Sequence, residues 1–146
     1  MAIAPAPQRD DFPVLRAMQT RWMDNDQYGH VNNVAYYSYF DTAVNGWLMA
    51  AAGADARLGA AIGVVAETSC RFLKEISFPD ALYVGLRLEK LGNSSVVYQL
   101  AVFRGDDVEP SALGRFVHVY VDRTTRRPVA VPQTIRAALV RLREKE

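Results

Sequence analysis

The sequence predicts an α+β fold in which an antiparallel sheet of about five strands wraps around one long central helix. Three observations predict this fold. Residues 34–52 are apolar around most of a helix, so another element must cover them. Segments that alternate apolar and polar residues follow, separated by turn residues, as in half-buried strands. The length of 146 residues, 50% of them hydrophobic, fits a single domain.

The central helix is predicted from a narrow polar stripe. Its members are spaced i, i+3, i+4 and i+7, and they are Ser38, Asp41, Thr42 and Asn45. Asn32 or Asn33 suits the N-cap of this helix, because a short polar side chain can accept a hydrogen bond from the first turn. Gly53 suits its C-terminal end.

The remaining elements follow from alternation and turn signals. The predicted strands span residues 13–22, 62–76, 82–89, 96–104 and 113–121, and a closing helix spans 132–142. We expect the last four strands to follow one another as an antiparallel meander, with turns at 92–95 and 105–107. A sheet that wraps one helix has free edges, so pairing between copies predicts a dimer or tetramer.

The domain organisation is predicted to be simple. Residues 1–12 are rich in alanine and proline, and we expect a flexible segment that buries nothing. Residues 13–146 then form one domain without internal repeats.

Composition argues against several classes of partner. The formal net charge is +1, so neither nucleic acid nor an anionic membrane surface is expected as the main partner. No run of about 18 apolar residues occurs, so no membrane span is predicted. Cys70 is the single cysteine and has no partner for an internal disulfide, which favours the cytoplasm.

The loop before the central helix, DNDQYGHVNN at residues 24–33, concentrates the residue types that carry chemistry. Asp24 and Asp26 are two residues apart, and we expect one of them to be structural. A helix N-terminus leaves backbone N–H groups unpaired and carries partial positive charge. A carboxylate beside such a donor supplies a base or nucleophile and an oxyanion stabiliser, which acyl transfer requires. On the residues alone, a purely structural interpretation competes, with the acids and asparagines as caps and His30 as a turn residue.

Other candidate residues give weaker signals. Cys70 shares a strand face with Phe72, which favours a core thiol over a nucleophile. His118 alternates with aromatic residues, which favours a hydrogen-bonded core histidine. Glu67 is either a second catalytic carboxylate or a buried, paired one. The candidate phosphate partners are Arg71, Lys74, Arg87, Arg104 and Arg115. Two histidines and one cysteine have no metal-ligand spacing, so no metal site is predicted.

Residues 21–37 resemble the signature of hotdog-fold acyl-CoA thioesterases, of the 4-hydroxybenzoyl-CoA thioesterase and bacterial acyl-CoA thioester hydrolase type. The family motif is approximately Asp-x-Asp-x-x-Gly-His-Val/Met-Asn-Asn followed by an aromatic-rich helix, and it matches Asp24 to Asn33 here. The resemblance continues through 70–72, 78–80, 91–95 and 116–121, and so covers roughly residues 14–140. It implies the hotdog fold and hydrolysis of acyl-CoA to the free acid and coenzyme A. No cofactor is predicted.

The resemblance also implies roles for particular residues. Asp26 is the expected catalytic carboxylate, and the backbone amide near Asn33 is expected to polarise the thioester carbonyl. Some relatives have histidine at the Asn33 position, so the role of His30 is left open. The residues expected to contact substrate are Tyr28 and Gly29 in the loop, Glu67 and Ser69 on the partner's second strand, and Asn93, Ser94 and Ser95 near the coenzyme A entrance.

Two alternatives to acyl-CoA hydrolysis stay open. The same fold can hydrolyse acyl groups carried by acyl-carrier protein, and a non-catalytic acyl-CoA binding protein would use the acidic loop only as a cap. The acyl group that is accepted and the choice between dimer and tetramer are not predicted.

Overall fold

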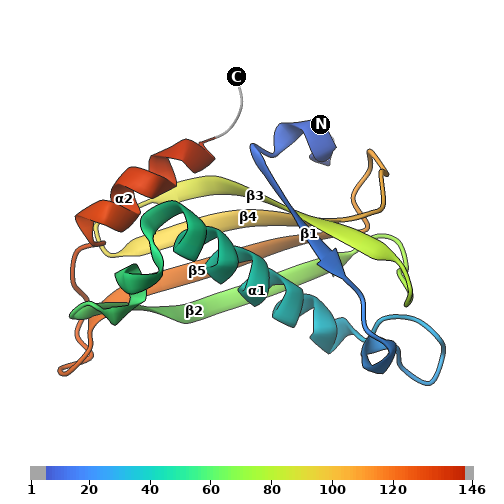
Figure 1. Cartoon of the computed structure of the whole chain (residues 1–146), viewed down its shortest axis with the longest axis horizontal. Helices are drawn as coiled ribbons and strands as arrows, with labels where there is room; N and C mark the ends of the chain where they lie inside the picture. Colours follow the sequence, from blue (N-terminus) through green and yellow to red (C-terminus); the bar gives the residue numbers. More distant parts are fainter. Residues whose placement is uncertain (1–5, 144–146) are drawn as a thin grey trace, which may run out of the picture.

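The computed structural model describes residues 6–143, which form one five-stranded antiparallel sheet and two helices on the same face of it (Figure 1). The elements are β1 (Val14–Gln19), α1 (Asn33–Ala52), β2 (Ala61–Phe72), β3 (Ala81–Leu91), β4 (Ser95–Arg104), β5 (Ala112–Asp122) and α2 (Gln133–Leu139). Short 3-10 turns lie at Arg9–Asp11, Trp22–Asp24, Ala54–Leu58 and Val140–Leu142. Among the described residues, no helix is both long and apolar enough to cross a membrane.

The strand order across the sheet is β1-β3-β4-β5-β2. The meander from β3 through β5 is confirmed, because these strands pair in sequence order. The predicted four-strand meander is wrong at β2, which pairs with β5 at the far edge instead of with β3. β1 already occupies the other edge of β3, so residues 73–80 carry the chain across the end of the sheet.

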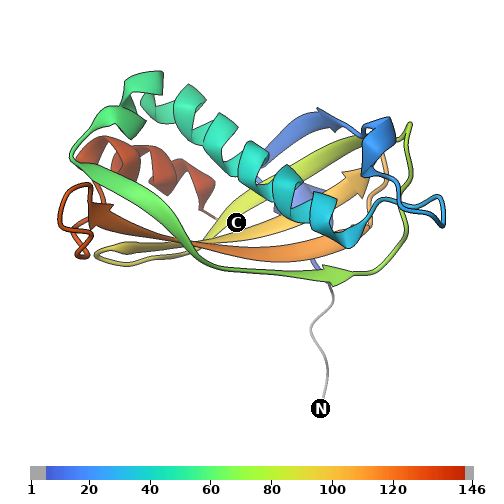
Figure 2. The same cartoon turned by 90° about the horizontal axis from the view of Figure 1, so that it is seen from below.

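The core lies between α1 and the concave face of the sheet (Figure 2). Buried side chains of α1 recur at helical spacing and are Tyr36, Tyr39, Phe40, Ala43, Val44 and Trp47. The predicted polar stripe of Ser38, Asp41, Thr42 and Asn45 is confirmed as the solvent face of the helix. The apolar side chains therefore hold α1 along the sheet, and its N-terminus is fixed near the start of β3.

Gly114 on β5 lies at a close contact between α1 and the sheet. A Cβ atom built on Gly114 would lie 2.5 Å from the ring of Phe40, which is fully buried. A glycine here lets the helix pack directly on the strand, and its neighbour Arg115 therefore points to the opposite, outer face.

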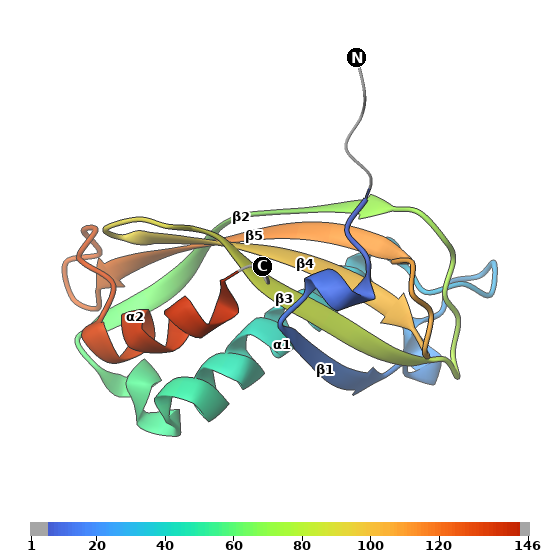
Figure 3. The same ribbon diagram turned by 90° about the horizontal axis from the view of Figure 1, so that it is seen from above.

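The outer face of the sheet is partly covered by the residues before β1. The segment before β1 lies over the outer face of the sheet (Figure 3). In this segment Phe12 is only 1% exposed and packs against Ala101 and Phe103. Arg9 donates hydrogen bonds from Nη1 to the backbone oxygens of Gly105 and Asp107. The prediction that residues 1–12 bury nothing is therefore wrong at Phe12, because a single aromatic residue without periodicity gave no signal. Residues 1–5 lie outside the described part.

β2 is a long edge strand. It pairs with β5 on one side, and within residues 6–143 no strand pairs with its other side. Two large apolar side chains of β2, Val65 and Phe72, are each nearly half exposed. A free edge of this length with exposed apolar residues is the kind of surface that a second copy of a chain covers.

The contact between Gly114 and Phe40 predicts that Gly114→Ala destabilises the fold by about 1–3 kcal/mol, because the added methyl group overpacks a closed core. Urea unfolding measures the difference. Gly59→Ala is the matched control, since its Cβ would meet only the Ala56 oxygen, at 3.9 Å, and its stability should stay within about 0.5 kcal/mol of the parent. Equal stability of Gly114→Ala and the parent protein contradicts this packing.

Candidate active site

Asp24 is a buried carboxylate, 3% exposed, at the start of the acidic loop. Its Oδ2 accepts hydrogen bonds from the Arg21 backbone N–H at 2.9 Å and the Tyr39 hydroxyl at 2.6 Å. Its Oδ1 accepts from the Arg21 guanidinium at 3.0 and 2.9 Å. Burial raises the pKa of Asp24, but these bonds favour the charged form and outweigh it, so the pKa lies below its ordinary value. Asp24 is thus the structural member of the acidic pair.

The loop is closed on itself by backbone hydrogen bonds. The Asn32 N–H donates to the Asp24 oxygen at 2.8 Å, and the Asp26 N–H donates to the His30 oxygen at 2.8 Å. Asn25 and Val31 form an isolated antiparallel bridge between these two bonds. Gly29, with φ of +83°, turns the chain in a conformation that suits glycine. The position of Asp26 is therefore set by the fixed stem below it.

The Asp26 carboxylate is half-buried, and only one of its oxygens is used by the turn. Oδ1 accepts from the Tyr28 N–H at 2.8 Å and weakly from the His30 N–H at 3.5 Å. No group within residues 6–143 donates a hydrogen bond to Oδ2. The turn orients the carboxylate and leaves Oδ2 able to accept a proton or to attack.

The start of α1 provides an unpaired amide. Of the two predicted candidates, Asn32 is the N-cap, and its side chain accepts from the Val34 N–H at 3.1 Å. The Asn33 N–H has no acceptor among the described residues, and Asn33 is exposed. This amide sits at the positive end of a 20-residue helix, where a negatively charged oxygen is favoured.

Asp26 and Asn33 line one open cleft of about 610 Å³. Its other lining residues are Tyr28, His30, Val31, Tyr36, Phe72, Leu73, Lys74 and Glu75. One wall is the ring pair of Tyr36 and Phe72, whose centroids are 4.9 Å apart in an edge-to-face arrangement. The cleft thus combines an apolar wall with a carboxylate and an open amide, as small-molecule sites do.

The segment after β2 braces the loop from the other side. The Ser77 hydroxyl donates to the Gly29 oxygen at 2.8 Å, and the Phe78 N–H donates to the Asn25 side chain at 3.0 Å. His30 Nε2 lies 2.9 Å from Glu75 Oε2. His30 is therefore tied to the neighbouring segment by its side chain and to Asp26 by its backbone.

Glu67 and Ser69 lie away from this cleft in the single chain. Glu67 forms an ion pair with Arg115 on the outer face of the sheet, at 2.9 Å, and is exposed. Ser69 pairs with Arg115 across the strands and shares that face. In the single chain Glu67 is therefore paired, as one alternative expected, but exposed.

The predicted substrate residues Asn93, Ser94 and Ser95 are far from Asp26 within one chain. They form the turn after β3, and α2 holds this turn through Arg136, which donates to the Gly92 oxygen at 2.8 Å. The opposite end of β3, at Ala81, pairs with Gln19 near the acidic loop. The two ends are separated by roughly 30 Å at 3.3 Å per strand residue.

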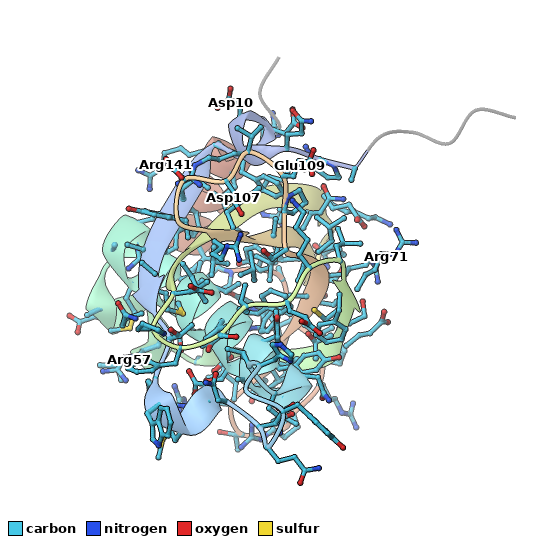
Figure 4. All side chains as sticks on the ribbon, turned by 90° about the vertical axis from the view of Figure 1, so that its right-hand side faces the viewer. Asp10, Arg57, Arg71, Asp107, Glu109 and Arg141 are labelled. Atoms are coloured by element: carbon cyan, nitrogen blue, oxygen red, sulfur yellow. The ribbon has the colours of Figure 1, made fainter. Side chains whose placement is uncertain are left out.

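The other sequence candidates fall into the core or onto the surface. Cys70 packs against the core, and burial raises the pKa of its thiol to about 11, so it is no activated nucleophile. Lys74 lines the cleft but is paired with Glu109 at 3.1 Å, while Arg71 is exposed and projects outward from the sheet edge (Figure 4). His118 is buried as predicted, yet its Nδ1 has no hydrogen-bond partner, so the expectation of a satisfied histidine is wrong.

The cleft-wall residues at the C-terminal end of β2 and just after it were not identified as site residues from the sequence. Phe72, Leu73 and Glu75 follow the acidic loop by some forty residues and carry no spacing signal of their own. The tertiary pairing of residues 75–78 with residues 25–31 brings them there. Among residues 6–143, no cluster of three or more side chains has the composition of a metal site.

Comparisons of the sequence and of the structure with known proteins agree on one family. Residues 20–139 match the Thioesterase-like superfamily. The PA5185 protein of Pseudomonas aeruginosa is 48% identical with a TM-score of 0.92, over 97% of this chain and 99% of that one. A thioesterase from Thermus thermophilus, crystallised with coenzyme A and Zn, is 30% identical with a TM-score of 0.76, over 91% and 96%. The PA2801 protein of Pseudomonas aeruginosa is 31% identical with a TM-score of 0.79, over 87% and 98%.

The bond from Tyr39 to Asp24 predicts that Tyr39→Phe destabilises the fold by about 1.5–3 kcal/mol at pH 7, the usual range for a bond to a charged group. The Asp24 pKa is lowered on folding, so the stabilisation is present above the unfolded pKa of about 3.9 and is lost as the pH falls through the lower folded pKa.

Urea unfolding of Tyr39→Phe at several pH values measures this effect. The difference from the parent protein should shrink as the pH falls below about 4. Tyr37→Phe is the control on the same helix, because no described residue bonds the Tyr37 hydroxyl. A difference for Tyr39→Phe that does not change with pH would show that the Asp24 charge is not what Tyr39 stabilises.

Proposed function

Because the chain belongs to the thioesterase-like superfamily of hotdog-fold hydrolases, we propose that it hydrolyses acyl-CoA thioesters with Asp26 as the catalytic carboxylate. The observation that carries the proposal is the shared cleft of Asp26 and Asn33, which holds a carboxylate with one unused oxygen beside an amide without an acceptor. These are the two groups that cleavage of a thioester needs.

The Asn33 amide supports the carbonyl side of the reaction. When the carbonyl carbon becomes tetrahedral, negative charge gathers on its oxygen, and an amide aimed at that oxygen stabilises the charge by about 3 kcal/mol. The dipole of α1 adds only about 0.3–1 kcal/mol at an exposed helix end. The directed hydrogen bond is therefore the larger contribution, and the start of α1 must stay in place for it to act.

Asp26 supports the nucleophilic side. As a general base, its Oδ2 takes a proton from water while the water oxygen bonds to the carbonyl carbon. As a nucleophile, Oδ2 bonds to that carbon, and water then cleaves the resulting anhydride. In both routes the carbon–sulfur bond breaks, coenzyme A leaves as the thiol after protonation, and the free acid remains. Oδ1 stays on the Tyr28 amide and keeps the carboxylate oriented.

His30 is a positioning residue in this proposal. Its backbone N–H reaches Asp26 and its side chain holds Glu75, so it connects the carboxylate to the segment that forms the cleft wall. Tyr28 is exposed on the rim of the cleft and is available to a bound substrate.

Coenzyme A is the proposed carrier because a relative of 30% identity was crystallised with it. Acyl-carrier protein is the alternative carrier. Rates on the same acyl group carried by coenzyme A and by carrier protein separate the two.

We also propose that the active form is a homo-oligomer built on a dimer that pairs through the free edge of β2. The exposed Val65 and Phe72 on this strand support it, and edge pairing would satisfy the open backbone groups. Antiparallel pairing about the strand centre brings the start of the partner's β2 beside Phe72, next to the cleft.

The cytoplasm is the proposed location. Cys70 is the single cysteine of the chain, and its half-buried thiol has no second thiol with which to form an internal disulfide.

Removing the charge at Asp26 is predicted to abolish most of the activity. Asp26→Asn should lower kcat by at least about 10²-fold, because the amide cannot take a proton from water or attack the carbonyl. Release of free thiol from a panel of acyl-CoAs measures it. Asp10→Asn, which removes an exposed acid remote from the cleft, is the control. A folded Asp26→Asn variant with near-parental kcat rules out the assignment.

A charge on the β2 edge is predicted to separate the subunits. Val65→Asp should convert the oligomer to monomers and lower activity in parallel, because the carboxylate would be buried in the interface. Sedimentation velocity gives the mass, and Val108→Asp is the control because Val108 is an exposed valine in the loop before β5. A Val65→Asp protein that remains an oligomer with parental activity contradicts the proposed interface.

A further inference from the structure

A second cavity lies at the other end of α1, away from the acidic loop. It has a volume of about 330 Å³ and is lined by the last turns of α1, the segment that follows it, the start of β2, the end of β5, and α2. These elements meet at one end of the molecule (Figure 1). Tyr36 lines the Asp26 cleft and Met49 lines this cavity; at 1.5 Å per residue they are about 20 Å apart along the helix. Within one chain the two are separate sites.

Half of the twelve lining residues are aliphatic, and the polar ones include Asn45 and Arg57. The apolar side chains come from four elements and are Leu48, Met49, Ala56, Ala61, Ile62 and Ile135. Gly63 lets the ring of Tyr120 pack closely on β2, because a Cβ atom there would lie 2.9 Å from that ring. The volume is within the range of sites that hold small molecules.

Two polar side chains without partners line the same cavity. His118 is 3% exposed and Tyr120 is 2% exposed, and both face α1 from β5. Nδ1 of His118 is fully buried without a hydrogen bond. No residue in the described range 6–143 bonds the Tyr120 hydroxyl either. Buried polar groups are nearly always paired, so a buried, unpaired His118 beside an unbonded Tyr120 hydroxyl in the lining of one cavity indicates a ligand that pairs with them.

The charge state of His118 and Tyr120 limits the class of ligand that the cavity can bind. Burial lowers the pKa of His118 to about 4 and raises the pKa of Tyr120 to about 12. Both are neutral at pH 7, and each then offers one donor and one acceptor. Arg57 also lines the cavity, but it is exposed and its Nε donates to the Ala54 oxygen at 3.3 Å. Beside the neutral, buried His118 and Tyr120 an ion would lose its hydration, whereas a hydroxyl group would be matched.

We propose that this cavity is a binding site for a small, uncharged apolar molecule that carries a hydroxyl group, with His118 and Tyr120 as its hydrogen-bond partners. The aliphatic walls take the hydrocarbon part, and the two polar side chains select for the hydroxyl. The inference goes beyond thioester hydrolysis and is tested by binding alone, so its failure leaves the role of Asp26 untouched.

The experiment uses benzyl alcohol and toluene, which differ by one hydroxyl group, and the full-length protein. Titration calorimetry gives the two Kd values, and amide chemical shifts locate the site. Benzyl alcohol should bind and shift residues around Ala56, Ile62 and Tyr120. His118→Phe should weaken benzyl alcohol by about fivefold relative to toluene, which is the effect of one net hydrogen bond.

A cavity-filling variant tests the location of the binding site without any change at His118. Ala56→Leu places a larger side chain in the space and should weaken both compounds at least tenfold, whereas Ala137→Leu, on the exposed side of α2, should leave both Kd values unchanged. The proposal is overturned if the parent protein binds neither compound, if the shifts map to the Asp26 cleft, or if Ala56→Leu changes neither Kd. An equal effect of His118→Phe on both compounds overturns the selection for the hydroxyl.

Discussion

The buried carboxylate of Asp24 is the interaction on which the geometry of the candidate active site depends. The carboxylate bonds to the turn at Arg21 and to Tyr39 inside α1, and the backbone oxygen of the same residue accepts from the N-cap residue Asn32. A charge at 3% exposure is tolerated only because each of its oxygens accepts two hydrogen bonds. This anchor fixes both the stem that carries Asp26 and the first residue of the helix, so the carboxylate and the open amide are held at one cleft by one buried group.

The helix α1 extends that arrangement along the whole molecule. Its first turn faces the Asp26 cleft, its middle is fixed by the contact of Phe40 with Gly114, and its last turns roof the cavity that contains His118 and Tyr120. The free edge of β2 runs between these two ends. Antiparallel pairing of two such edges places the cavity end of one copy near the cleft end of the other. In the proposed dimer, the Asp26 cleft of one copy therefore lies close to the second cavity of its partner.

The sequence predicted the elements better than their pairing. Local periodicity and turn residues predicted the polar stripe of α1, its cap at one of two asparagines and the β3–β5 meander. Such patterns can be recognised within a short stretch of the sequence. The placement of β2 beside β5 and the burial of Phe12 depend on contacts between distant segments, for which no local pattern exists. At the site, the expectation that one member of the acidic pair is structural is confirmed at Asp24, whereas the cleft walls at Phe72 and Glu75 arise from tertiary pairing alone.

The central claim is that the Asn33 amide and the Asp26 carboxylate act on the same thioester. A crystal structure of the protein with an acyl-CoA analogue in which a methylene group replaces the sulfur tests it most directly, since the resulting ketone keeps the carbonyl and resists hydrolysis. The account predicts the carbonyl oxygen about 2.7–3.1 Å from the Asn33 nitrogen, with Asp26 facing the carbonyl carbon. A carbonyl bound elsewhere, with Asp26 and Asn33 both out of reach, would contradict it.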